Sequence, residues 1–266
     1  MDGESLNLLK RCRHGMMLFN PRDQYVGKSL DLYGEYSEGE IELFRQVVKA
    51  GDVVLDVGAN IGAHTVCLAQ LTGRQGTVIA FEPQRILFQT LCANLALNGL
   101  LNVDCRQMAV GDQPGSLLVP ALNYFRPANF GGLSLGEWDS GAKVSVVPLD
   151  SLQLVRCEFI KIDVEGMELA TLRGALGTIR RFRPYLYVEN DRAAQSSELE
   201  CMIDSLGYAM YIHRPPLFNP SNYAGRGENA FSGVVSSNLF CVPAERSHVA
   251  QGFRQVIVPT RLHEES

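Results

Sequence analysis

The fold is decided by one stretch of sequence, Val53-Val54-Leu55-Asp56-Val57-Gly58-Ala59-Asn60-Ile61-Gly62. Its first five residues are almost continuously apolar, which is typical of a parallel strand buried on both faces. Gly58 and Gly62 lack a Cβ atom, so the backbone can turn sharply there and approach a ligand closely. Open α/β sheets bind ligands beyond the carboxyl ends of their strands. The stretch therefore predicts an α/β fold with a ligand site at this turn.

Strands and helices alternate on both sides of this stretch. Apolar residues at helical spacing predict helices over residues 38–50, 62–71, 83–98, 167–180 and 197–206. Besides 53–57, short apolar runs predict sheet strands at residues 77–81, 103–110, 159–163, 185–189, 208–213 and 238–242. We therefore expect a doubly wound, mostly parallel sheet of seven strands with right-handed crossovers. Residues before 38 show turn signals and no clear periodicity, and residues 111–150 form an insertion with one or two short strands, such as 143–147.

Composition narrows the class of protein. Of 266 residues, 46% are hydrophobic and 20% are charged, as in ordinary globular domains. The formal net charge of -5 gives no general attraction to nucleic acid or to an anionic membrane, so we expect neither as a partner. The apolar runs are too short to span a bilayer, and the start of the chain lacks a signal-peptide core. The seven cysteines include no C-x-x-C pair, which favours a reducing, cytoplasmic compartment.

The glycine turn has an acidic partner further along the chain. Glu82 ends the second predicted strand, where a carboxylate can accept both hydroxyls of a ribose. The spacing is G-x-x-x-G rather than the G-x-G-x-x-G of dinucleotide-binding enzymes, and no Gly-Lys-Ser/Thr follows as in a P-loop. A tight turn needs glycine with or without a ligand. Turn and carboxylate together favour a nucleoside without phosphates.

Four motifs together resemble the FkbM family of S-adenosylmethionine-dependent methyltransferases. They are D-V-G-A-N-I-G-A-H-T at 56–65, F-E-P at 81–83, I-K-I-D-V-E-G-M-E at 160–168 and Y-V-E-N at 187–190. The resemblance covers roughly residues 35–210 and implies the class I methyltransferase sheet. It also implies S-adenosyl-L-methionine as cofactor and S-adenosyl-L-homocysteine as product.

The resemblance assigns cofactor-binding roles to eight residues. It implies that Asp56, Gly58, Asn60 and Gly62 line the methionine end, that Glu82 holds the ribose, and that Ala109 and Val110 lie near the adenine. Thr65 is expected to bond the cofactor carboxylate from the first turn of its helix. We expect residues 1–37 to form a flank that covers the cofactor, residues 38–243 to form the methyltransferase domain, and residues 244–266 to form a tail.

A second acidic cluster follows the next two strands of the sheet. Asp163 and Glu165 end one strand and Glu189-Asn190 ends its neighbour, so their side chains should share the crevice of the Gly58 turn. Asp163, Glu165 and Glu189 are the candidates for a catalytic base or for orienting a hydroxyl, in no fixed order. Asp163 or Glu165 alone would also suit a helix cap. Asp163, Glu189 and Asn190 have oxygen ligands suitable for Mg²⁺, as in catechol-type methyltransferases, although we do not favour a metal.

The predicted function is methyl transfer to a hydroxyl of a small molecule, sugar or secondary metabolite, so the partner is a small-molecule or glycan acceptor. Two other classes remain: a nucleotide-dependent oxidoreductase, and a non-catalytic module that binds the cofactor. The loops at 129–134 and 211–231 are expected to approach the acceptor. The Y-G-E segment at 33–35 is expected to bring Glu35 or Tyr36 to the cofactor, with a capping box between Ser37 and Glu40.

Overall fold

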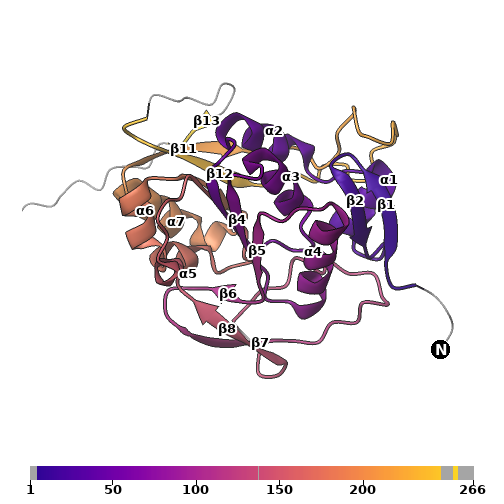
Figure 1. The fold of residues 1–266 in the computed structure, drawn as a ribbon, viewed down its shortest axis with the longest axis horizontal. Coiled ribbons are helices and arrows are strands. Elements are labelled where there is room, and N and C mark those ends of the chain that lie inside the picture. The colour runs from indigo at the N-terminus through magenta and orange to yellow at the C-terminus, as the bar shows by residue number, and fades with distance from the viewer. Residues whose placement is uncertain (1–4, 137, 247–253, 257–266) are drawn as a thin grey trace, which may run out of the picture.

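A single large sheet forms the centre of the molecule (Figure 1). The computed structural model describes residues 5–136, 138–246 and 254–256. The order of strands across the sheet is β5 (Val103–Arg106), β4 (Thr77–Phe81), β3 (Val53–Val57), β9 (Phe159–Ile162), β10 (Tyr185–Glu189), β12 (Asn238–Pro243), β11 (Tyr208–His213) and β13 (Arg254–Gln255). The first five run parallel, and β12 is antiparallel to both of its neighbours. The predicted seven-stranded, mostly parallel sheet is confirmed, with the two-residue β13 added at its edge.

Helices cover both faces of this sheet, which explains why its strands are apolar on both sides. In β3, Val54 faces one core cluster, whereas Leu55 and Val57 face the other. One face carries α2 (Glu38–Val47), α3 (Ala63–Thr72) and α4 (Arg85–Leu97). The opposite face carries α5 (Glu168–Arg173), α6 (Leu176–Phe182) and α7 (Ala193–Ser205). The carboxyl ends of the parallel strands are thus left as the open edge for a site.

Two predicted elements are each broken in two. The helix expected over residues 167–180 is interrupted at Gly174, where a Cβ atom would lie 2.0 Å from the carbonyl oxygen of Gly111. The strand expected over residues 103–110 ends at Arg106, whose carbonyl accepts a bond from the Met108 N–H in a tight turn. The remainder, β6 (Ala109–Val110), joins β8 (Ala142–Val147) and β7 (Gly115–Val119) in a separate sheet. A short 3-10 helix, η1 (Leu149–Leu152), returns the chain to the main sheet.

The first forty residues are more regular than the sequence predicted. They form a hairpin of β1 (Leu8–Cys12) and β2 (Gly15–Phe19), followed by α1 (Val26–Tyr33). The backbone of β2 is bonded by side chains of α4, because the N–H of Leu18 donates to Asn94 Oδ1 at 2.6 Å. These elements are too short for sequence periodicity to reveal, and they owe their order to packing on α4.

The tail predicted at 244–266 is described only in part. Arg254–Gln255 pairs with β11, and the tail beyond Val256 lies outside the described residues.

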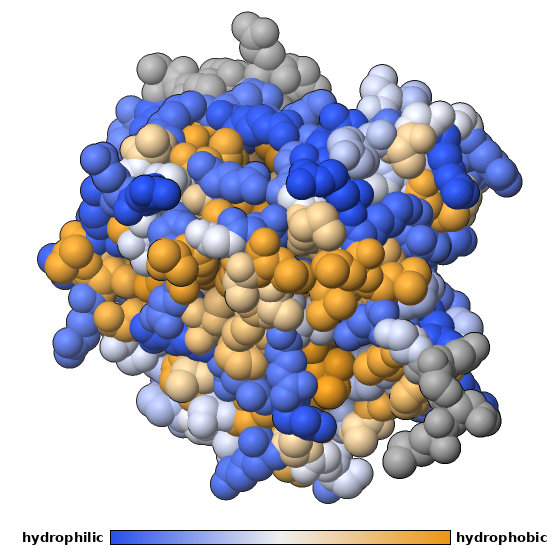
Figure 2. Space-filling view, turned by 45° about the vertical axis from the view of Figure 1, so that its right-hand side comes forward, coloured by the Kyte–Doolittle hydropathy of each residue, from blue (hydrophilic) through white to orange (hydrophobic). Residues whose placement is uncertain are grey.

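The surface mixes polar and apolar residues, as is usual for a folded chain. Figure 2 shows a hydrophobic band across the middle of one face, bordered by hydrophilic side chains. Large exposed apolar residues include Leu101 and Phe125, at 96% and 62% exposure. All seven cysteines are free. Within the described ranges, no helix has the length and apolarity needed to cross a bilayer. A cytoplasmic location stays a prediction.

Candidate active site

The turn after β3 packs closely against the residue that follows β9 and against α4. Gly58 has a φ of 84°, and a Cβ atom there would lie 1.6 Å from the carbonyl oxygen of Asp163. Gly62 has a φ of 85°, and a Cβ atom added there would lie 2.6 Å from the Leu91 side chain. The expectation that both glycines make room for a ligand is therefore only half met: Gly58 lines a cavity, whereas Gly62 packs on α4.

Glu82 is joined directly to the turn. Its two carboxylate oxygens accept the backbone N–H groups of Asn60, at 2.9 Å, and of Gln84, at 2.8 Å. The side chain is 4% exposed, and this burial raises the pKa of Glu82 to about 7 although both backbone bonds lower it. Each oxygen keeps a lone pair for a further donor. Gly58, Asn60 and Glu82 therefore form one continuous wall of the cavity.

Asp56 and Thr65 lie beneath this wall. Asp56 is completely buried and accepts the Thr65 hydroxyl at 2.7 Å, and Thr65 is equally buried. Neither residue lines the cavity, so the structure places them as supports of the turn and does not bring the Thr65 hydroxyl to a ligand. Ala109 and Val110 are 2% exposed in β6 and do not line the cavity either. Of the eight residues predicted to contact the cofactor, these four and Gly62 do not line the cavity.

Lys161 was not singled out by the sequence analysis. It pairs with Asp56 across β9 and β3, and its Nζ lies 3.7 Å from Asp56 Oδ1 and 3.0 Å from Asp163 Oδ2. Burial by itself lowers the pKa of Lys161, but the carboxylates of Asp163, Asp56 and Glu40 together raise it above its ordinary range. A lysine inside an apolar strand was the signal available in the sequence, because a buried charge needs partners.

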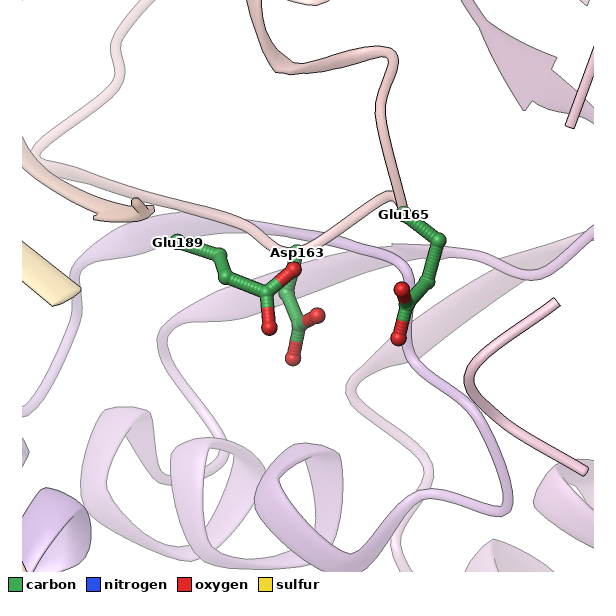
Figure 3. A group of neighbouring side chains, drawn as sticks. All are labelled: Asp163, Glu165 and Glu189. Atoms are coloured by element: carbon green, nitrogen blue, oxygen red, sulfur yellow. The ribbon is translucent and has the colours of Figure 1, made fainter. Parts of the chain in front are cut away.

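Three predicted catalytic carboxylates come together above β9 and β10 (Figure 3). Asp163 and Glu165 follow β9, Glu189 ends β10, and oxygen atoms from all three lie within 4.8 Å of one another. Glu165 also bonds the Arg192 guanidinium at 3.1 Å. None of the three acts as the cap of α5, since α5 begins at Glu168 with no side-chain cap bond. The structure therefore brings the three carboxylates together at one place, as their positions at the strand ends predicted.

Asn190 is not part of this cluster. Its side-chain amide donates to Glu200 on α7 at 3.2 Å, and it does not line the large cavity. The metal ligand set proposed from sequence, Asp163, Glu189 and Asn190, is therefore replaced by a set that contains Glu165. Lys161 on Asp163 and Arg192 on Glu165 already compensate two of its three carboxylates.

Proximity changes the acidity of these carboxylates. Burial, followed by the charge of Asp163, raises the pKa of Glu165 to about 7. Burial and then the charges of Asp163 and Glu165 raise the pKa of Glu189 far above its ordinary range. Glu189 Oε2 is buried and has no hydrogen-bond partner. At neutral pH, Glu189 is therefore protonated unless a cation reaches it.

The cavity has a volume of about 320 Å³, and three separate segments border it above the sheet. The N-terminal flank contributes Tyr25, Val26 and Tyr36, the insertion contributes Asn129, Gly131 and Gly132, and the loop before β12 contributes Leu217 and residues 234–237. The loops at 129–134 and 211–231 were both expected here, although His213 is bonded to the Tyr187 hydroxyl at 2.8 Å and does not line the cavity.

Only one of the two residues expected at the cofactor from the Y-G-E segment lies at the cavity. Tyr36 lines the cavity, whereas the Glu35 carboxylate binds Arg13 at 2.6 Å and the backbone N–H of Tyr223 at 2.7 Å. Ser37 precedes α2, but its hydroxyl donates to the Glu40 carboxylate at 2.7 Å and makes no cap bond to the helix backbone. The predicted capping box is wrong in that respect. The bond keeps Glu40 at the cavity wall.

Comparison with known proteins places this site in a family. The model of the FkbM methyltransferase domain matches residues 56–210, more than half of the chain. The chain belongs to the FkbM methyltransferase family. The match begins at the Asp56 turn and includes all three carboxylates of the cluster.

Individual relatives are more distant. Methyltransferase 1 of Beauveria bassiana is 26% identical over 189 residues, which is 61% of this chain and 74% of that protein. An FkbM methyltransferase from Methylobacillus flagellatus is 18% identical with a TM-score of 0.49, over 76% of this chain and 50% of that one. Fibrillarin from Aeropyrum pernix, solved with bound S-adenosyl-L-methionine, is 11% identical with a TM-score of 0.43, over 91% and 85% of the two chains.

Proposed function

We propose that this FkbM methyltransferase uses S-adenosyl-L-methionine to methylate a hydroxyl group of a small molecule, sugar or secondary metabolite. One observation carries the proposal: Asp163, Glu165 and Glu189 face the same cavity as the wall of Gly58, Asn60 and Glu82. A wall suited to a nucleoside and a set of potential proton acceptors thus share one cavity.

The residues present suit that cofactor. Glu82 offers two carboxylate oxygens, each with a free lone pair, for the ribose hydroxyls. The Asp163 carboxylate, at the end of β9 beside the Gly58 turn, favours the cationic methionine end. When bound, the cofactor supplies an electrophilic methyl group, and the protein's part is to align the acceptor and to take its proton.

The acidities assign different roles to the three carboxylates. A general base works best when its pKa is near the working pH, which favours Glu165 as the base. Lys161 fixes Asp163 in place, so that Asp163 orients the hydroxyl. Glu189 is protonated in the empty cavity and cannot accept a proton there, so we assign it to ligand binding and not to catalysis. Tyr25, Val26 and Tyr36 of the flank, together with the insertion, lie over the cavity and would shield the bound cofactor from water.

The test is methyl transfer from labelled S-adenosyl-L-methionine to a pool of hydroxylated small molecules and glycans. We expect S-adenosyl-L-homocysteine and a product whose NMR spectrum shows an O-methyl group. Glu165→Gln should lower kcat by about 100-fold while cofactor affinity changes little. Glu42→Gln is the matched control, because Glu42 is exposed on the outer side of α2. An N-methyl or C-methyl product would contradict the proposal.

Metal assistance is not proposed. Lys161 and Arg192 already neutralise two carboxylates, and Asn190 is directed to Glu200. EDTA is therefore expected to leave turnover unchanged, and restoration of a lost activity by Mg²⁺ would show that the carboxylates hold a metal after all.

A further inference from the structure

Acidic side chains dominate the wall of the cavity. Its acidic members are Glu40, Glu82, Asp163, Glu165, Glu189 and Asp191. Among the described residues that line it, there is no lysine, arginine or histidine. An acceptor with a negative charge would be repelled from such a wall, and a wholly apolar one would leave its carboxylates without partners.

Cations behind the wall compensate only part of this charge. Lys161 serves Asp163 and Arg192 serves Glu165, as described above. The cofactor of the proposed function adds a sulfonium and an ammonium group against one carboxylate, and so brings a single net positive charge. The six carboxyl groups still outnumber the three positive charges, so some of them, Glu189 first, stay protonated until a further cation enters. Glu189 in particular contacts other carboxylates and has an oxygen that is buried and unbonded.

A second polar group stands beside Glu189. Asn238 lies opposite it in the pairing of β10 and β12, lines the cavity and is 6% exposed. Its Nδ2 makes no hydrogen bond of full geometry, although the Tyr187 hydroxyl lies near it, so the amide is open to a better acceptor. Because a buried polar group without a full hydrogen bond is costly, the pair Glu189 and Asn238 is built for a ligand that brings both a cationic donor and an oxygen acceptor.

We propose that the acceptor of this enzyme carries a protonated amine close to its hydroxyl groups, as in an amino alcohol or amino sugar. The ammonium group binds Glu189, a neighbouring oxygen accepts the Asn238 amide, and another hydroxyl of the same molecule faces Glu165 for methylation. This inference rests on the proposed function and names the substrate class of the same site.

The acidity of Glu189 is consistent with this occupant. Without a cation, burial and the adjacent carboxylates keep Glu189 protonated. An ammonium group takes the place of that proton, so the amine binds with release of a proton from the protein. An uncharged hydroxyl in the same position would leave the protonated form unchanged.

The experiment compares ligands that differ at one position. Protein loaded with S-adenosyl-L-homocysteine is titrated calorimetrically at pH 7 and low salt with glucosamine, N-acetylglucosamine, glucose and glucuronate. We expect glucosamine to bind at least about ten times more tightly than its acetylated form, and glucuronate to bind least. The inference is overturned if glucosamine does not bind, or if it binds no more tightly than N-acetylglucosamine.

Glu189→Gln isolates the residue responsible. Glutamine has the same shape without the charge, so glucosamine should lose about tenfold in affinity while N-acetylglucosamine is unaffected. Glu42→Gln should change neither ligand. A Glu189→Gln protein that keeps the full preference for glucosamine contradicts the assignment. Titration of the unloaded wild-type protein with S-adenosyl-L-methionine separates the two claims, because failure of cofactor binding would overturn the proposed function itself.

Discussion

At the scale of single residues, the site depends on a buried ammonium group. Lys161 is 2% exposed and lies between Asp56, which supports the turn, and Asp163, which faces the cavity. Sequence motifs drew attention to the carboxylates, because these end strands. The lysine between them was missed because its role depends on the register of β3 and β9, which no single-chain pattern encodes.

Replacing that lysine should be costly. Lys161→Met leaves Asp56 and Asp163 without their cation, and breaking a buried pair typically costs about 3–5 kcal/mol of unfolding free energy. Chemical denaturation at pH 7 measures the loss. The double variant Lys161→Met with Asp163→Asn should recover part of it, since one uncompensated charge is then removed. A loss below about 1 kcal/mol would show that the pair contributes little.

Glu165 should make activity depend on pH near neutrality. Its pKa of about 7 in the folded protein means that the base is ionised only above that pH. We expect kcat/KM to rise between about pH 6 and 8 and to level off above, and we expect Glu165→Gln to remove this rise. A wild-type profile that is flat over this range would exclude Glu165 as the base.

The same shift has a consequence for stability. Because the folded-state pKa of Glu165 lies above its ordinary value of 4.5, the folded state binds more protons between pH 4.5 and 7. The contribution of Glu165 to stability is thus fully present below pH 4.5 and is lost as the pH rises through 7. Glu165→Gln should raise the unfolding free energy more at pH 8 than at pH 5, and the reverse order would contradict the assigned shift.

At the scale of elements, the turn from β3 to α3 was the most predictable part of the molecule. Buried parallel strands are continuously apolar, so β3, β4 and β10 begin and end where the sequence predicted. The breaks at Gly174 and Arg106 were not predictable, because they arise from contacts with distant segments. The site residues divide in the same way: the strand-end carboxylates line the cavity as predicted, whereas Asp56 and Thr65 lie buried behind its wall.

The turn itself can be tested with a matched pair of glycines. Gly58 and Gly51 both have left-handed backbones, with φ values of 84° and 89°. A Cβ atom at Gly58 meets the Asp163 carbonyl, whereas at Gly51 it meets nothing within 4 Å. Gly51→Ala should cost only about 1–2 kcal/mol of backbone strain. Gly58→Ala should cost clearly more and abolish cofactor binding in calorimetry. Equal effects would show that packing against Asp163 is unimportant.

At the scale of the whole molecule, two of the three segments that border the cavity, the flank and the insertion, are distant in sequence and are bonded to each other. Asp23 in the flank accepts the N–H of Gly27 at 3.0 Å and the N–H of Phe130 in the insertion at 3.2 Å. The family motifs implied a covering flank, but the contact between flank and insertion depends on loops whose conformation the sequence does not encode. The cover is thus a joint structure of residues 20–27 and 124–132.

Loosening this cover should affect cofactor release first. Asp23→Ala removes these two bonds and a third from the Tyr25 N–H, so we expect faster dissociation of S-adenosyl-L-methionine in stopped-flow measurements with the central sheet intact by circular dichroism. Asp31→Ala is the control, because Asp31 forms only an exposed ion pair with Lys10. An unchanged dissociation rate in Asp23→Ala would mean that the cover does not retain the cofactor.

The most direct test of the central claim is calorimetric titration of the full chain with S-adenosyl-L-methionine and S-adenosyl-L-homocysteine, with Glu82→Gln alongside. The Glu82 carboxylate accepts the N–H of Asn60 in the turn and the N–H of Gln84 after β4, whereas a glutamine has a single acceptor oxygen and can keep only one of these bonds. We predict one cofactor per chain and at least about tenfold weaker binding in Glu82→Gln. Absence of binding by either ligand to the wild-type protein would contradict the account.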